Sequence, residues 1–200
     1  MANSPAIGEV DLTKIPEDVV TIGLNRILAR YMPDYILIVD KSVEPKYHPT
    51  EGALRGGLLT IGSTPYVRRS DAIVMKRGKS KTTQHPPWVW PKSFSDPLIM
   101  AGNSACYAFQ WALLTGAREI AVIGLDYTHK MLRDKGEQTH FYGKNPINQK
   151  LECDINGVQK QFWLEAAARA NCIDLSPYDG TPFQWHCQWP RESWESYCSR

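Results

Sequence analysis

Short apolar runs alternate with helical patterns along most of this chain, and that alternation limits the folds it can adopt. The runs are rich in Val and Ile, as buried strands are, and they lie at 19–24, 34–40, 120–125 and 172–175, with weaker candidates at 58–61 and 72–75. Helical spacing is found at 103–115 and again from Asn156 onward. Strands joined through helices favour parallel pairing. The sequence therefore predicts an α/β fold with a single Rossmann-like, doubly wound, mainly parallel sheet.

Composition narrows the class of protein. With 200 residues, 42% of them hydrophobic, and a formal charge of +2, the chain has the size and balance of one soluble α/β domain. No apolar run reaches the ~18 residues that would span a bilayer, and the first residues lack the pattern of a signal peptide. The 5 cysteines form no CxxC or CxxH pair, so reduced thiols are expected and no metal site is. These features predict a cytoplasmic protein.

The chain divides into a main part and a tail on composition alone. Residues 1–182 carry all the predicted strands and helices, and we expect them to form one domain. Residues 183–200 are rich in Trp but show no helical or strand period. We expect this tail to pack over the domain or against another subunit of a homo-oligomer.

Polar residues follow several of the predicted strands. Asn25, Asp40 and the pair Asp126-Tyr127 each come directly after an apolar run. In an open parallel sheet, side chains at the carboxyl ends of strands face the ligand crevice. Asn and Asp also form turns for purely structural reasons, so each residue alone has that alternative reading. Their recurrence after successive strands favours a shared binding site.

The helix predicted at 103–115 begins on Gly102-Asn103-Ser104. Free N–H groups at a helix start suit a phosphate, and glycine lets a ligand approach the backbone closely. The alternative is that Asn103 or Ser104 is an ordinary helix cap. The common ATP and NAD patterns GxxxxGKS and GxGxxG are absent from the sequence.

Two further features have both a chemical and a structural reading. His140 lies in a polar loop, where a histidine can serve as a general base for a hydroxyl or can simply be exposed to solvent. The segment 66–81 carries six basic residues against one acidic residue. It could attract an anionic acceptor such as nucleic acid, or it could be a solvated face.

In this order the segments resemble the bacterial sialyltransferases of glycosyltransferase family 42. They also resemble a wider Rossmann-like group around domain of unknown function 115, which includes archaeal 6-hydroxymethylpterin diphosphokinases. The similar segments are Asn3-Ser4-Pro5 with residues 10–16, Gly23-Leu24-Asn25, 102–104, 116–126, 139–143 and 174–177. At the first turn Ser4 replaces the family's glycine and no serine follows Pro5. We expect the strand that precedes this turn in the family to be missing or replaced.

The resemblance implies an inverting, metal-independent glycosyltransferase that moves a sugar from a nucleotide-activated donor, of CMP-sugar type, to a hydroxyl. It implies that His140 deprotonates the acceptor, a glycan or a modified nucleic acid. The nucleotide would be held by a set of polar residues with Tyr127 beside the phosphate, and the full set is Asn3, Asn25, Asp40, Asn103, Ser104, Asp126 and Tyr127. The nucleotide-sugar is a substrate, and no other cofactor is expected.

Two other functions remain open at this point. A Mg²⁺-dependent pyrophosphokinase or nucleotide hydrolase on the same scaffold would need a carboxylate role for Asp40 or Asp126. A non-catalytic protein that binds a nucleotide or nucleic acid would need only the binding residues, and the basic segment 66–81 favours it.

Overall fold

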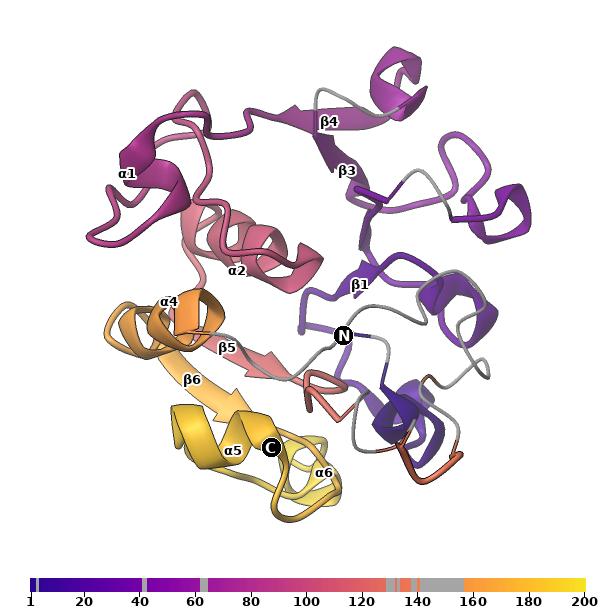
Figure 1. Cartoon of the computed structure of the whole chain (residues 1–200). Coiled ribbons are helices and arrows are strands. Elements are labelled where there is room, and N and C mark those ends of the chain that lie inside the picture. The colour runs from indigo at the N-terminus through magenta and orange to yellow at the C-terminus, as the bar shows by residue number, and fades with distance from the viewer. Residues whose placement is uncertain are drawn as a thin grey trace. The chain divides into compact units, whose positions relative to one another are not determined.

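The computed structural model describes residues 1–2, 4–40, 43–61, 65–128, 132, 134–137, 140 and 157–200. The chain forms two compact units. Unit 1 consists of Met1–Val19 and Glu119–Arg200, and unit 2 consists of Val20–Arg118. Each unit is described by itself below, with the element labels of Figure 1.

Unit 2 is built on a four-stranded sheet in the order β1-β2-β3-β4. Its strands are β1 (Ile22–Leu24), β2 (Tyr35–Leu37), β3 (Gly57–Ile61) and β4 (Ala72–Met75). All neighbouring strands pair in parallel, and β3 is buried along its whole length. A strand that is covered on both faces needs apolar side chains throughout, which explains the continuous run in the sequence.

Short helices connect and follow these strands. The 3₁₀ helices η3 (Ile27–Ala29), η4 (Pro45–Tyr47) and η5 (Pro65–Arg68) precede β2, β3 and β4, and α1 (Lys81–Gln84) and α2 (Ser104–Leu114) follow β4. Gln110 on α2 is fully buried and bonds both the N–H and the C=O of Ile99, at 2.7 and 3.1 Å. These two bonds hold the segment around Ile99, which precedes α2, against that helix. They also satisfy the buried side-chain amide of Gln110.

Unit 1 contains a two-stranded parallel sheet of β5 (Glu119–Val122) and β6 (Asn171–Asp174) (Figure 1). Its helices are η1 (Pro5–Gly8), η2 (Leu12–Lys14), α4 (Gly157–Ala167), α5 (Pro182–Cys187) and α6 (Trp194–Tyr197). The N-terminal segment lies along the residues that follow β5, because Ala2 N–H donates to Ile123 O at 2.8 Å and Ser4 N–H donates to Gly124 O at 3.2 Å.

An aromatic cluster forms the core of unit 1. Trp163 on α4 packs edge-on against Phe183 and Trp189, with ring centroids 5.8 and 5.6 Å apart. Phe162 and Tyr127 extend the cluster, and Tyr127 stacks on Phe183. Residues of the predicted tail thus belong to this core.

The α/β class and the parallel strand pairing predicted from sequence are confirmed. The strands of the described residues divide into two sheets, whereas the sequence predicted one. Within the described residues, no helix combines the length and the apolar character needed to cross a membrane. The prediction of one domain over 1–182 with a separate tail stays a prediction.

Candidate functional site

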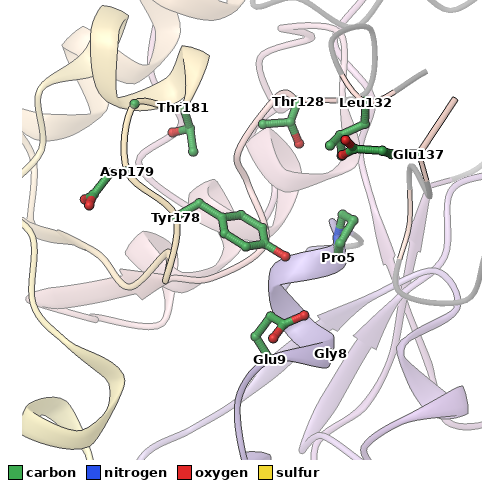
Figure 2. Close-up of a pocket in the computed structure, with 10 residues that line it drawn as sticks. Pro5, Gly8, Glu9, Thr128, Leu132, Glu137, Tyr178, Asp179 and Thr181 are labelled. Carbon is green, nitrogen blue, oxygen red and sulfur yellow. The ribbon is translucent and has the colours of Figure 1, made fainter. Parts of the chain in front are cut away.

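A pocket of about 510 Å³ opens in unit 1 (Figure 2). It is lined by helix η1 and by the segments that leave the carboxyl ends of β5 and β6, and the lining residues are Pro5, Gly8, Glu9, Thr128, Leu132, Glu137, Tyr178, Asp179, Gly180 and Thr181. Its volume is within the usual range for small-molecule sites. The carboxyl ends of parallel strands are also where α/β proteins bind ligands.

A cluster of buried polar residues supports this pocket. The Ser4 hydroxyl donates to Asp126 Oδ2, and the side chain of Ser176 also hydrogen-bonds Asp126. All three residues are buried, at 1 to 4% exposure. Each lies one or two positions from a lining residue, namely Pro5, Thr128 and Tyr178. The cluster therefore holds together three chain segments that form the walls of the pocket.

Burial controls the protonation of the carboxylates in this cluster. It raises the pKa of Asp126 above the usual 3.8, while the hydrogen bonds from Ser4 and Ser176 lower it and the nearby Asp174 raises it. The pKa of Asp174 is also raised by burial, against hydrogen bonds from Ser176 N–H and Gln184 and the charge of Arg191. Two neighbouring carboxyl groups thus both favour the neutral form more than exposed carboxyls do.

Tyr178 places a phenol hydroxyl in the pocket. Burial raises its pKa, and the charges of Glu9 and Asp126 raise it further. The hydroxyl consequently stays protonated at neutral pH and can both donate and accept a hydrogen bond. Figure 2 shows the ring of Tyr178 extending between Thr181 and Pro5 into the lined space.

Thr128 supplies a second hydroxyl with an unusual property. The residue is only 4% exposed, and its Oγ1 has no hydrogen-bond partner among the described residues. A buried hydroxyl without a partner costs free energy in the folded state. Figure 2 places Thr128 on the wall that faces Tyr178 and Pro5.

The charged residues of the lining are acidic. Glu9 and Glu137 are exposed carboxylates, and Asp179 forms an ion pair with Arg191. No Lys, Arg or His occurs among the described residues that line the pocket. The described lining thus combines carboxylates with hydroxyl groups.

The predicted site residues of unit 1 have different surroundings. Asp126 belongs to the cluster beneath the pocket. Tyr127 is 7% exposed, and its hydroxyl accepts a hydrogen bond of 2.8 Å from Trp163 Nε1 within the core. His140 is half-buried. Asn3 lies outside the described residues.

In unit 2, Asn25 and Asp40 follow the neighbouring parallel strands β1 and β2. Asn25 adopts φ +50°, and its Oδ1 is buried with no partner among the described residues. Asn103 caps α2, because its Oδ1 accepts from Cys106 N at 3.0 Å, and Ser104 is the first residue of that helix. Asn103 is thus a helix cap, whereas the buried Oδ1 of Asn25 has no hydrogen-bond partner among the described residues.

The basic segment 66–81 contains one structural arginine. Arg69 binds Asp71 through two nitrogens and donates to Pro49 O at 2.6 Å. The other basic side chains of the segment are exposed, namely Arg68, Lys76, Arg77, Lys79 and Lys81. Their exposure is consistent with either a solvated face or an anion-attracting surface.

Comparisons with protein-family models, with curated proteins and with solved structures found no match for this chain. Within the described part of the chain, no group of three or more His, Cys, Asp or Glu side chains could hold a metal ion. The site must therefore be interpreted from its own chemistry.

Sequence reasoning did not find Thr128 and Tyr178 as site residues. Both lie a few residues beyond a strand end, at Val122 and Asp174, so an extended search of the strand-end loops would have included them. Glu9 had no comparable signal, because its place at the pocket depends on the N-terminal segment returning to β5.

Proposed function

We propose that this chain is a glycosyltransferase-like enzyme, and that the pocket of unit 1 holds the sugar that it transfers from a nucleotide-activated donor of CMP-sugar type. The observation that carries the proposal is the pocket at the carboxyl ends of β5 and β6, whose lining contains the phenol of Tyr178 and the carboxylate of Glu9. A sugar ring offers hydroxyls that both donate and accept, which is the complement that these groups need.

The transfer chemistry rests on the resemblance of the chain to sialyltransferases. His140 takes the proton from an acceptor hydroxyl, whose oxygen forms a bond to the anomeric carbon of the sugar. The bond from that carbon to the phosphate oxygen breaks, and its electron pair leaves with the nucleotide. A positioned base and a good leaving group are sufficient for this displacement, so no metal is required.

A second candidate is a Mg²⁺-dependent pyrophosphokinase or nucleotide hydrolase. The acidic lining favours it, because the exposed carboxylates Glu9 and Glu137 line the same pocket. Carboxylates and phosphate oxygens together are the ligands that Mg²⁺ prefers. This function predicts a strict Mg²⁺ requirement for nucleotide binding, whereas the glycosyltransferase does not need the ion.

Thermal unfolding with CMP, UDP, GDP and ATP, each with and without Mg²⁺, separates these functions, because a ligand that binds only the folded state raises its Tm. A shift with CMP that does not depend on Mg²⁺ supports the glycosyltransferase. A shift with ATP or GDP only in the presence of Mg²⁺ supports the second candidate and contradicts the first. The absence of a shift with every nucleotide contradicts both.

Replacing His140 with Ala tests the general base. We expect His140→Ala to bind the nucleotide as the parent chain does, because the imidazole acts on the acceptor, and to lose ~10²-fold or more in turnover. Release of the free nucleotide from a CMP-sugar in the presence of a hydroxyl acceptor measures that rate. His186→Ala is a control, since His186 is an exposed residue on α5 outside the pocket lining. Parent-like turnover in the His140 variant would remove this residue from the mechanism.

A further inference from the structure

We infer that unit 2 binds single-stranded nucleic acid on a surface around α1. This surface runs from the end of β4 through α1 to the loop that precedes α2 (Figure 1). We call it the α1 surface, and its members are five cations and one aromatic ring, namely Lys76, Arg77, Lys79, Lys81, Lys92 and Phe94. The inference goes beyond the function proposed for the pocket of unit 1 and does not depend on it.

The α1 surface concentrates positive charge in one stretch of the chain. Between Asp71 and Asp96 the sequence has five Lys or Arg and no Asp or Glu. The side chains of all five cations are exposed. Asp71, at one end of the stretch, is bound by Arg69 through two nitrogens. A nucleic acid whose phosphates are neutralised by such cations releases counterions, and this release supplies most of the affinity that does not depend on sequence.

The two ends of this stretch lie close together in the structure. The backbone N–H groups of Lys92 and Ser93 donate to the Asp96 carboxylate at 2.8 and 3.0 Å and lower its pKa, and the charge of Lys76 lowers that pKa further. The Leu98 N–H also donates to Lys76 O at 2.8 Å. The loop that carries Lys92 is therefore beside the end of β4, so that one run of phosphates can contact cations of both segments.

Phe94 adds an aromatic ring to this charged surface. It is 54% exposed, and its ring packs on Trp111 of α2 with centroids 4.8 Å apart. Because Trp111 is buried, it holds the Phe94 ring in place while much of that ring stays open to solvent. Proteins hold single strands by combining cations for the phosphates with aromatic rings on which unpaired bases stack. The ring therefore favours a single strand over a duplex, whose bases are already stacked on one another.

The local structure also favours nucleic acid over an anionic membrane. Proteins that lie on a membrane surface commonly use an amphipathic helix, which buries an apolar face among the lipids. Helix α1 has the sequence KTTQ, so it offers no apolar face. The exposed side chains of the α1 surface thus suit a chain of phosphates and bases better than a layer of lipid.

Fluorescence anisotropy of the full chain with a labelled oligothymidylate of about 15 nucleotides tests the inference. We expect a Kd of about 10⁻⁶ to 10⁻⁴ M at physiological salt, and an affinity whose logarithm falls with log salt concentration at a slope of about −2 or steeper, as contact with three or more phosphates requires. A duplex of oligothymidylate with oligoadenylate should bind at least about fivefold more weakly. The inference is overturned if the single strand does not bind, if the duplex binds equally well, or if only vesicles of phosphatidylserine and phosphatidylcholine bind.

Reversal of two charges tests the cations. The double variant Lys79→Glu with Lys81→Glu should weaken oligothymidylate binding at least about tenfold and make the salt slope shallower. The control is Lys14→Glu with Lys160→Glu, which makes the same change of charge at two exposed lysines of unit 1. Equal weakening by the two double variants would show that net charge determines binding, and it would overturn the assignment to the α1 surface.

The variant Phe94→Leu tests the ring, because leucine keeps an apolar side chain against Trp111 but offers no face for a base. It should weaken oligothymidylate binding at least about fivefold and leave the salt slope unchanged, since no cation is lost. Val89→Ala trims another exposed apolar side chain of the same loop, of 62% exposure, and should not weaken binding. If Phe94→Leu binds the single strand as tightly as the parent chain, the role of the ring is wrong and the assignment of a single strand fails.

Discussion

Two buried threonine hydroxyls in this chain have opposite surroundings. Thr60 on β3 is fully buried, and its Oγ1 donates to Ile38 O at 3.0 Å. Thr128 Oγ1 is also buried, but no described group bonds to it. The Thr60 hydroxyl thus has a hydrogen bond within unit 2. The Thr128 hydroxyl is buried on folding without a hydrogen bond from the described residues.

This difference makes a stability prediction. Thr60→Val should lower the free energy of unfolding by about 1 kcal/mol, because the carbonyl of Ile38 loses its buried donor. Thr128→Val keeps the shape of the side chain and removes an unpartnered hydroxyl, so it should leave that free energy unchanged to within about 0.5 kcal/mol, or raise it. Urea unfolding of the two variants measures both values. Equal destabilisation by the two substitutions would show that Thr128 has a partner in the folded protein.

The sequence predicted Asp126 as a site residue because it follows a strand. In the structure Asp126 belongs to the buried polar cluster that supports the pocket. Tyr127 is adjacent in sequence, yet its side chain enters the core because its backbone turns at φ +57°. A strand-end pattern identifies where the chain leaves the sheet. It does not determine which of two consecutive side chains faces a ligand, since that depends on backbone dihedral angles.

Among the elements, those with a clear apolar period were the predictable ones. Strand β4 has the bounds expected from its β-branched run, and α2 begins and ends within one residue of its expected limits. The short helix α1 lies outside the segments in which the sequence shows helical spacing. Four residues are too few to show a helical period. Helix α1 is also held by the segment that precedes α2, because Met100 N–H donates a hydrogen bond to Thr83 O.

The tail is the element for which composition was least informative. Its tryptophans have no period, so the sequence could not separate Trp185, which is exposed, from Trp189, which is 4% exposed. The burial of Trp189 depends on α4, because its indole donates to Trp163 O at 3.3 Å and its ring packs on Phe183. Such contacts between distant segments are set by tertiary packing.

These two tryptophans provide a matched test of the core of unit 1. Trp189→Ala should lower the free energy of unfolding by about 3–5 kcal/mol, because it leaves a cavity inside the aromatic cluster. Trp185→Ala removes an exposed side chain and should change it by less than about 0.5 kcal/mol. Chemical denaturation followed by circular dichroism gives both values. If the Trp189 variant were as stable as the parent chain, the cluster would not be the core of this unit.

At the scale of the whole molecule, the free energy of unfolding should depend on pH, because burial raises the pKa of some carboxyl groups and an ion pair lowers the pKa of another. Asp126 and Asp174 have folded-state pKa values raised by burial above 3.8. Their contribution to stability is complete below pH 3.8 and is lost as the pH rises through the folded-state pKa values. Asp71 behaves oppositely, since Arg69 lowers its pKa to about 2, and its contribution is lost only as the pH falls toward that value.

The variant Asp126→Asn tests this dependence. Asparagine cannot ionise and still offers an oxygen to the Ser4 hydroxyl, so the variant should gain stability relative to the parent chain as the pH rises from about 4 to 7. Urea unfolding at intervals across that range measures the difference. Glu17→Gln is a suitable control, because Glu17 is exposed and lies in the same unit. A stability difference that is constant with pH would contradict a raised pKa for Asp126.

The hydrogen bond from Ser4 to Asp126 joins residues 122 positions apart, and this separation affects the order in which the protein can be completed during synthesis. All residues of unit 2 are made before β5, so its sheet can form while translation continues. Helix η1 is made before unit 2, whereas Asp126 and the lining residues beyond β6 are made after it. The pocket can therefore form only after all of unit 2 has been synthesised, and its closure brings together segments that are far apart in the sequence.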